Sequence, residues 1–244
     1  MKGKVVVVGL GPGDERLRTP AATAALEGAD LFVGYKGYLD QLSDFRPSVP
    51  RVSTGMTGEV ARCQEAVKRA SEGANVALVC SGDAGIYGMA SLVCQLAYPL
   101  GVEVTIEPGV TAATAAAALM GAPLGHDLAF ISLSDRLTPW DLILKRLRLA
   151  AEADLCLCLY NPVSHGRPDH LKNACTTLME VIPPTRPCGW ARQVGREGQE
   201  VHLCTLEELA QSKLDMFCLC IIGNSMTQQL GSWLVTPRGY KGVE

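Results

Sequence analysis

The chain has 244 residues, of which 48% are hydrophobic and 19% charged, and its formal net charge is −3. This composition excludes a disordered chain, and the small negative charge gives no reason to expect a nucleic-acid partner. No apolar run approaches the roughly 20 residues of a membrane-spanning helix, so we expect no membrane partner.

Strands and helices are predicted to alternate in the first half of the chain. Thr19 followed by Pro20 has the pattern of an N-cap with proline at the first helical position, and Gly28 is placed to end that helix. Apolar runs predict strands at residues 5–8, 31–33, 76–79 and 102–106, with helices at 21–27, 59–72 and 89–98. This alternation, with glycine turns, predicts an α/β fold with a largely parallel sheet.

The pattern changes after an alanine-rich, uncharged segment, residues 111–120, which we expect to be a buried helix. The second half has more closely spaced strands, at 128–133, 155–160, 187–192, 200–204 and 217–222, with helices at 139–151, 171–181 and 206–211. We therefore place a domain boundary within residues 109–122. The prediction is an N-terminal α/β domain, 1–112, and a C-terminal α/β domain, 113–244, with a mixed sheet.

Two turns of small residues follow consecutive predicted strands. The first is Cys80-Ser81-Gly82-Asp83-Ala84-Gly85-Ile86-Tyr87-Gly88-Met89, and the second is Glu107-Pro108-Gly109-Val110-Thr111-Ala112. Glycine lets the backbone approach a ligand closely, and open α/β sheets bind ligands at the carboxyl ends of their strands. These turns predict a ligand site, in which Asp83 either contacts the ligand or caps its own turn.

Ten cysteines raise the question of a metal site or a disulfide framework. There is no C-x-x-C pair, and the four histidines do not stand at zinc-finger distances from cysteines. We expect buried, reduced thiols, no metal site, and a cytoplasmic location where thiols stay reduced.

The first glycine loop, Gly9-Leu10-Gly11-Pro12-Gly13-Asp14, must be compared with a dinucleotide fingerprint. It has aspartate where G-x-G-x-x-G requires the last glycine, and Gly34-Tyr35 stands where the ribose-binding acid is expected. No G-x-x-x-x-G-K-[ST] segment is present either. The loop does not have the pattern of an NAD or ATP site.

Taken together, the turns resemble the ordered motifs of the tetrapyrrole methyltransferases, the S-adenosyl-L-methionine (SAM)-dependent enzymes of cobalamin and sirohaem biosynthesis. The resemblance covers essentially the whole chain and rests on residues 9–14, 81–88, 108–112, 159–162, 221–224 and 236–240. Further segments are similar to the precorrin-3B C(17)-methyltransferase and cobalt-factor III methyltransferase branch: Gly34-Tyr35 with Tyr38, Gly55-Met56 with Glu59 and Arg62, 121–127 and 132–140.

The resemblance implies two α/β domains with SAM in the cleft between them, a homodimer, and a tetrapyrrole substrate. It also implies SAM-binding roles for particular residues, which are Pro12, Gly82, Asp83, Ile86, Thr111, Ala112, Tyr160, Asn161 and Val194. Candidates for handling protons are Asp135, His126 and Asp127. One departure is the segment after Asn161-Pro162, where a further basic residue is expected.

The expected reaction methylates carbon 17 of the tetrapyrrole and contracts the ring, a step implied by the resemblance alone. In-line methyl transfer needs positioning more than a protein nucleophile, and no catalytic triad is evident in the sequence. Two alternatives stay open: a relative acting at another ring carbon, and a non-catalytic SAM- or tetrapyrrole-binding module. The sequence also leaves open whether the substrate carries cobalt.

Overall fold

The computed structural model describes residues 2–55 and 57–242. It divides into two compact units, unit 1 (Met1–Ala112) and unit 2 (Ala113–Glu244), and each is described by itself.

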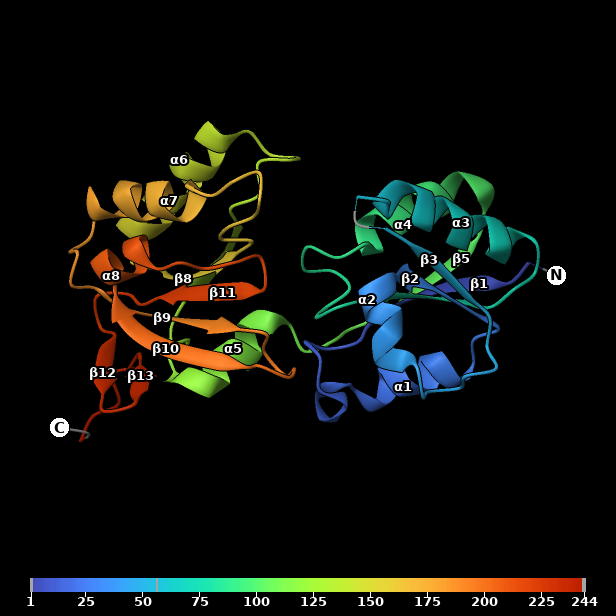
Figure 1. Cartoon of the computed structure of the whole chain (residues 1–244), viewed down its shortest axis with the longest axis horizontal. Coiled ribbons are helices and arrows are strands. Elements are labelled where there is room, and N and C mark those ends of the chain that lie inside the picture. The colour runs from blue at the N-terminus through green and yellow to red at the C-terminus, as the bar shows by residue number, and fades with distance from the viewer. Residues whose placement is uncertain (1, 56, 243–244) are drawn as a thin grey trace. The chain divides into compact units, whose positions relative to one another are not determined.

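Unit 1 is built on a parallel sheet whose strand order is β3-β2-β4-β1-β5 (Figure 1). Its strands are β1 (Lys4–Gly9), β2 (Leu31–Tyr35), β3 (Arg51–Thr54), β4 (Val76–Cys80) and β5 (Glu103–Glu107). The central strands β1 and β4 are apolar apart from Lys4 at the start of β1, because both faces of the sheet are covered there, as expected in a parallel sheet. The predicted N-terminal parallel sheet is confirmed.

Helices pack on both faces of this sheet. They are η1 (Glu15–Leu17), α1 (Pro20–Glu27), α2 (Lys36–Leu39), η2 (Asp40–Leu42), α3 (Glu59–Ser71), α4 (Ala90–Ala97) and η3 (Tyr98–Leu100). Val5 and Val7 face α3 and α4, whereas Val6 and Val8 face α1 and α2. Thr19 caps α1 as predicted, since its side chain accepts a hydrogen bond from the Ala22 N–H.

Unit 2 has a mixed sheet of strand order β10-β9-β11-β8-β7. Its strands are β7 (Leu128–Ser132), β8 (Cys156–Tyr160), β9 (Pro187–Arg192), β10 (Glu200–Thr205) and β11 (Cys218–Ile222). Only the β7–β8 pair is parallel among these strands in the described chain, and the other neighbours are antiparallel. The prediction of a mixed C-terminal sheet is confirmed.

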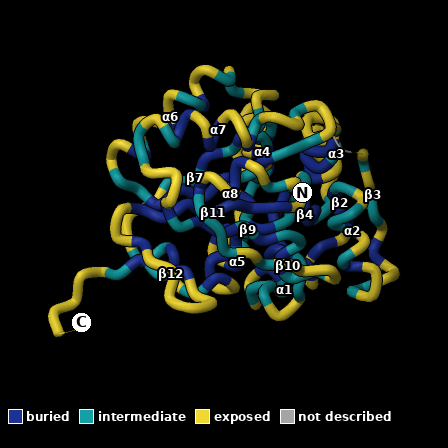
Figure 2. The backbone as a smooth tube through the Cα atoms, turned by 60° about the vertical axis from the view of Figure 1, so that its left-hand side comes forward, coloured by how far each residue is buried: buried dark blue, intermediate teal, exposed yellow. Residues whose placement is uncertain are grey.

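The helices of unit 2 are α5 (Ala112–Met120), α6 (Trp140–Glu152), α7 (His170–Met179) and α8 (Leu206–Gln211). One apolar cluster joins α6, α7 and α8 to one face of the sheet through residues such as Leu147, Leu171 and Leu206. Figure 2 shows central strands such as β4 and β11 as buried, whereas β3, β10 and β12 are mostly intermediate or exposed. The alanine-rich α5 buries Ala113, Ala115–Ala117 and Met120, whereas Thr114, Ala118 and Leu119 are exposed.

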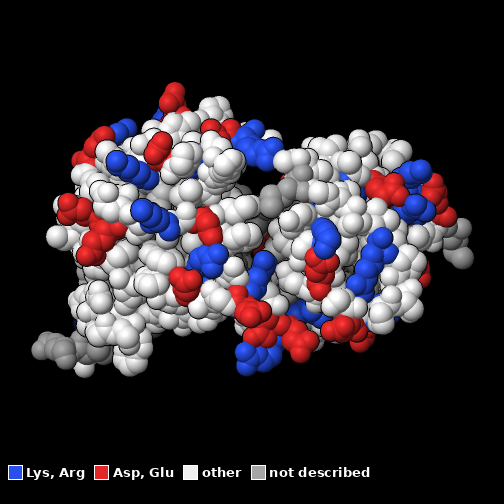
Figure 3. All heavy atoms as spheres, in the orientation of Figure 1, with Lys and Arg blue, Asp and Glu red and all other residues white. Residues whose placement is uncertain are grey.

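The sequence patterns did not predict β3, α2 or a small sheet of order β12-β13-β6. Its strands are β6 (Gly121–Ala122), β12 (Gln228–Leu230) and β13 (Trp233–Val235), each too short to show a period. On the surface shown in Figure 3, basic and acidic side chains are interspersed. Among the described residues, no helix combines the length and apolarity needed to cross a membrane.

Candidate functional site

The three loops that follow β4, β1 and β5 meet at the carboxyl edge of the sheet in unit 1. These strands are neighbours and run parallel, so their ends lie side by side. Residues 10–14, 81–89 and 108–111 form the loops. The structure thus brings together the first glycine loop and both small-residue turns.

Close backbone packing explains why position 109 at this edge is a glycine. A Cβ on Gly109 would lie 2.2 Å from the carbonyl oxygen of Gly82 and 2.7 Å from that of Gly9. Two hydrogen bonds join the first two loops, from the Gly82 N–H to the Gly11 oxygen at 2.7 Å and from the Gly11 N–H to the Gly82 oxygen at 3.1 Å. Any side chain at position 109 would separate the loops.

Gly82 differs from Gly109 because a Cβ built on Gly82 would make no close contact. A Cβ there would meet only the Ala112 nitrogen at 3.7 Å and the Thr111 Cα at 3.8 Å. The residue has φ +67°, a left-handed conformation that glycine adopts without steric cost. Gly82 therefore leaves room for a ligand atom beside Thr111 and Ala112, two residues for which the sequence motifs predict cofactor binding.

Asp83 joins the two small-residue turns. Its Oδ1 accepts hydrogen bonds from the N–H groups of Gly85 (2.8 Å) and Ile86 (3.0 Å), and its Oδ2 accepts one from Gly109 (3.0 Å). These contacts are those of a turn-capping aspartate that also reaches the neighbouring loop. Pro12 is buried in the loop after β1, directly after Gly11.

In unit 2, three further predicted residues share one edge of the sheet. Register pairs Leu159 of β8 with Cys220 of β11, and Cys220 with Trp190 of β9. The carboxyl end of β8, with Tyr160 and Asn161, therefore lies at the same edge as the end of β9. Val194 follows β9 two residues later and is buried.

Hydrogen bonds fix this edge locally. The Tyr160 hydroxyl accepts a bond from the Ala113 N–H at 3.2 Å, which ties β8 to the start of α5. Asn161 has φ +53°, and its Nδ2 donates to Ser132 Oγ at 2.9 Å. The same oxygen accepts from the Ser134 N–H at 3.2 Å, so the loops after β7 and β8 are joined.

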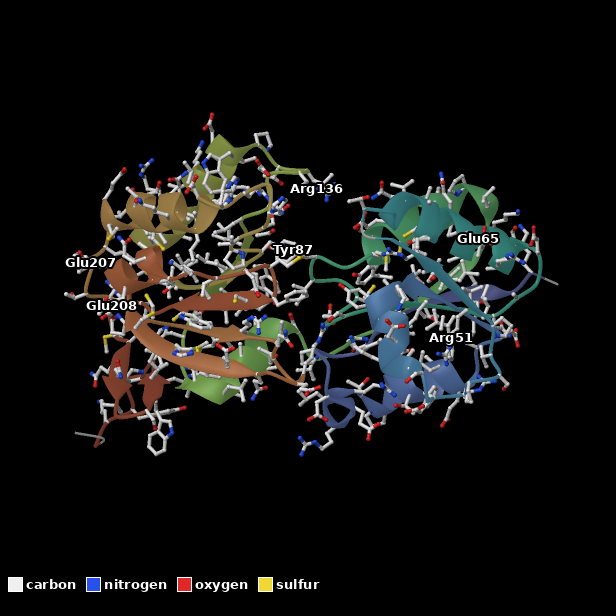
Figure 4. All side chains as sticks on the ribbon, viewed as in Figure 1. Arg51, Glu65, Tyr87, Arg136, Glu207 and Glu208 are labelled. Atoms are coloured by element: carbon white, nitrogen blue, oxygen red, sulfur yellow. The ribbon has the colours of Figure 1, made fainter. Side chains whose placement is uncertain are left out.

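Asp135 lies in the loop after β7 and faces two basic side chains. Its Oδ2 is 3.3 Å from Nε2 of His170, and its Oδ1 is 3.7 Å from Nη1 of Arg167. Figure 4 shows Arg136 at the tip of this loop, extending away from the sheet. The segment after Asn161-Pro162, where a basic residue was expected, therefore supplies Arg167 and His170 to Asp135. No sequence pattern had predicted a role for either residue.

His126 and Asp127 lie elsewhere in unit 2. They are exposed and directly precede β7, whereas Asp135 follows it. At about 3.3 Å per residue, the five-residue strand separates the two ends by roughly 16 Å. The structure thus brings Asp135 to the edge that carries Tyr160 and Asn161, but it does not bring His126 and Asp127 there.

Comparison with known proteins decides the family of this site. The model for Tetrapyrrole (Corrin/Porphyrin) Methylases matches residues 4–210. The chain belongs to the tetrapyrrole methylases. The expectation from the sequence motifs is confirmed.

Individual tetrapyrrole methylases resemble the chain over nearly its full length. A probable cobalt-factor III C(17)-methyltransferase of Salmonella typhimurium is 46% identical, over 96% of this chain and 98% of that protein. A precorrin-3B C(17)-methyltransferase of Sinorhizobium sp is 41% identical, over 100% of this chain and 99% of its own length. The crystal structure of the methyltransferase CobJ is 40% identical with a TM-score of 0.91, over 96% of this chain and all of that one.

Some motifs of this tetrapyrrole methylase have packing roles. Thr236 is buried, and its Oγ1 donates to the Pro123 oxygen at 2.6 Å. A Cβ on Gly223 would lie 2.4 Å from Thr227, at the opposite edge from Tyr160. Arg62 is buried, and it donates to Thr54 Oγ1 and to the Gly55 oxygen. Met56 of the same motif lies outside the described residues.

The cysteines of this tetrapyrrole methylase are free, and most are buried. Burial raises the pKa of the Cys63 thiol to about 12 and that of Cys80 to about 11, so both are protonated at neutral pH. The expectation of burial is wrong for Cys94, which is exposed on α4. Its neighbours Val93 and Ala97 face the core, whereas Cys94 lies beside this buried face and reaches solvent.

Proposed function

We propose that this tetrapyrrole methylase transfers the methyl group of SAM to carbon 17 of precorrin-3B or cobalt-factor III, with contraction of the ring. The chain is a C-methyltransferase of cobalamin biosynthesis. The observation that carries the assignment is the glycine-lined edge of unit 1, where Gly82 leaves open space beside Thr111 and Ala112. The full-length likeness to two C(17)-methyltransferases supports the position of methylation.

The residues of unit 1 suit the amino-acid end of SAM. This end carries an ammonium and a carboxylate, and backbone carbonyl and amide groups of glycine turns can meet both. We assign Gly82, Asp83 and Ile86 to the methionine and ribose portion, and Thr111 and Ala112 to the carboxylate end. Asp83 serves this role by holding the two turns together, since both of its oxygens accept backbone N–H groups.

In unit 2, Tyr160, Asn161 and Val194 provide a flat aromatic ring, an amide and an apolar side chain at one sheet edge, which suit a purine base. We assign these residues to adenine and place Pro12 of unit 1 toward the reacting methyl group. SAM supplies an activated methyl group bound to a sulfonium. The contribution of the protein is alignment, because in-line displacement by an electron-rich ring carbon gains most of its rate from positioning.

Transfer of the methyl group from the sulfonium leaves a positive charge on the tetrapyrrole ring. The ring loses this charge when it gives up a proton, and that step requires a proton acceptor. Asp135 is the candidate that the structure supports, because it lies at the same edge as Tyr160 and its carboxylate is partly exposed. His126 and Asp127 remain predictions without a structural link to this edge.

The test is incubation with SAM carrying a labelled methyl group and, separately, precorrin-3B and cobalt-factor III, followed by mass spectrometry of the products. One labelled methyl per tetrapyrrole at carbon 17 supports the function. The substrate that is methylated faster shows whether the tetrapyrrole carries cobalt before this reaction. Label at another ring carbon supports a different family specificity. Binding of SAM with no transfer to either tetrapyrrole would support the non-catalytic alternative.

We also propose a homodimer in the cytoplasm. The predominantly buried, free thiols are consistent with a reducing compartment. Light scattering coupled to gel filtration measures the mass, which for a dimer is twice the 26.0 kDa of one chain.

A further inference from the structure

Two buried nitrogen atoms in unit 2 lack a hydrogen-bond acceptor among the described residues, and both face one carboxylate. They are Nε2 of His170 and Nη1 of Arg167, which lie 3.3 Å and 3.7 Å from the two oxygens of Asp135. Native proteins rarely keep a buried donor without an acceptor, so each such atom calls for an explanation. Here two such donors lie next to the same side chain, the Asp135 carboxylate.

Both donors are held in place by contacts outside Asp135. The His170 ring packs against Trp140, with ring centroids 4.1 Å apart and planes inclined by 57°. Arg167 Nε donates to Ser164 Oγ at 2.9 Å, and the Arg167 N–H donates to the Ser164 oxygen at 2.8 Å. The positions of both donors therefore do not depend on hydrogen bonds with Asp135.

The exposure of the three side chains shows which of them a substrate can reach. The Asp135 side chain is 38% exposed, whereas His170 and Arg167 are 18% and 16% exposed. The Asp135 carboxylate is therefore the most accessible of the three groups to a substrate, and the two donors are more deeply buried. Hydrogen bonds at catalytic residues are often long in the free enzyme and shorten when substrate is bound.

We propose that His170 is a positioning residue, which acts through Asp135 in the methylation chemistry and which Arg167 assists. This inference rests on the proposed function. The new carbon–carbon bond uses an electron pair of the ring, and the electrons of the broken carbon–sulfur bond stay on sulfur. Asp135 then accepts one proton from the substrate, whose bonding electrons neutralise the ring. The Nε2–H of His170 donates to Oδ2 and orients the carboxylate for that transfer.

The decisive variants are His170→Ala and His170→Gln, with His202→Ala as the control. His202 is an exposed histidine on β10, stacked on Trp190, and it lies in the same unit. Calorimetry measures SAM affinity, steady-state assays separate kcat from KM, and thermal unfolding checks the fold. We expect His170→Ala to lower kcat on the order of 10²-fold, the scale of general acid–base contributions. SAM affinity and His202→Ala activity should stay unchanged.

Two further results distinguish positioning from packing. The amide of His170→Gln can still donate to Asp135, so this variant should recover much of the lost kcat. In an Asp135→Asn background, His170→Ala should cause little additional loss, because residues that act through one another are not additive. Full activity of His170→Ala, or an equal further loss in the Asp135→Asn background, would overturn the inference. Absence of methyl transfer by the unmodified protein would instead overturn the proposed function.

Discussion

Replacing Asp83 by asparagine tests how the two small-residue turns are held together. Asp83 uses both oxygens, Oδ1 for Gly85 and Ile86 and Oδ2 for Gly109. An asparagine has one oxygen, so its amide loses either the bond from Gly109 or the two bonds from Gly85 and Ile86, and it turns an NH₂ group toward a backbone N–H. A hydrogen bond to a charged acceptor contributes about 1.5–3 kcal/mol, and partial exposure of this site lowers the expected loss to about 1–2 kcal/mol.

The same loss should appear in cofactor binding, because the broken tie allows the turn at Gly109 to move away from Gly82. A cost of 1.4 kcal/mol corresponds to a tenfold weaker Kd, so calorimetry should show roughly tenfold weaker SAM binding. Asp30→Asn is the matched control. Asp30 holds the Asn75 N–H through Oδ2 at 2.9 Å before β2 and β4, a tie that one amide oxygen can keep. Unchanged SAM affinity in a folded Asp83→Asn protein would refute this reasoning.

Three other predictions concern the cofactor space, acid stability and the thiols. Gly82→Ala and Gly101→Ala replace glycines at φ +67° and +59°, so both carry the backbone cost, but only Gly82→Ala should weaken SAM binding in calorimetry. Although burial raises it, hydrogen bonds from Ser225 and the charge of Arg186 hold the pKa of Asp154 below its usual 3.8. The stability that this shift provides is present above pH 3.8 and lost as pH falls through the lower folded-state pKa, so urea unfolding of Asp154→Asn should depend less on pH in that range. Ellman's reagent should label about one thiol per native chain quickly, Cys94, and labelling of several at the same rate would contradict the observed burial.

Much of the fold follows from local sequence patterns. Apolar runs such as that of β4 predict buried strands, and Thr19-Pro20 predicts the start of α1, because period and backbone preference act over a few residues. Gly82 and its neighbours likewise identify a turn at a strand end. The short strands β3, β6, β12 and β13 escape this reasoning, since two to four residues carry no period and their pairing depends on distant segments.

The alternating elements, the small-residue turns and the family motifs of this tetrapyrrole methylase can all be recognised from local sequence. Two relations appear only once the chain is folded: Asp83 reaches Gly109, 26 residues further along the chain, and His170 and Arg167 lie next to Asp135. The fold also places His126 at the far end of β7 from Asp135. These relations depend on which strands pair and in which register, and that choice is made by packing between segments far apart in the chain.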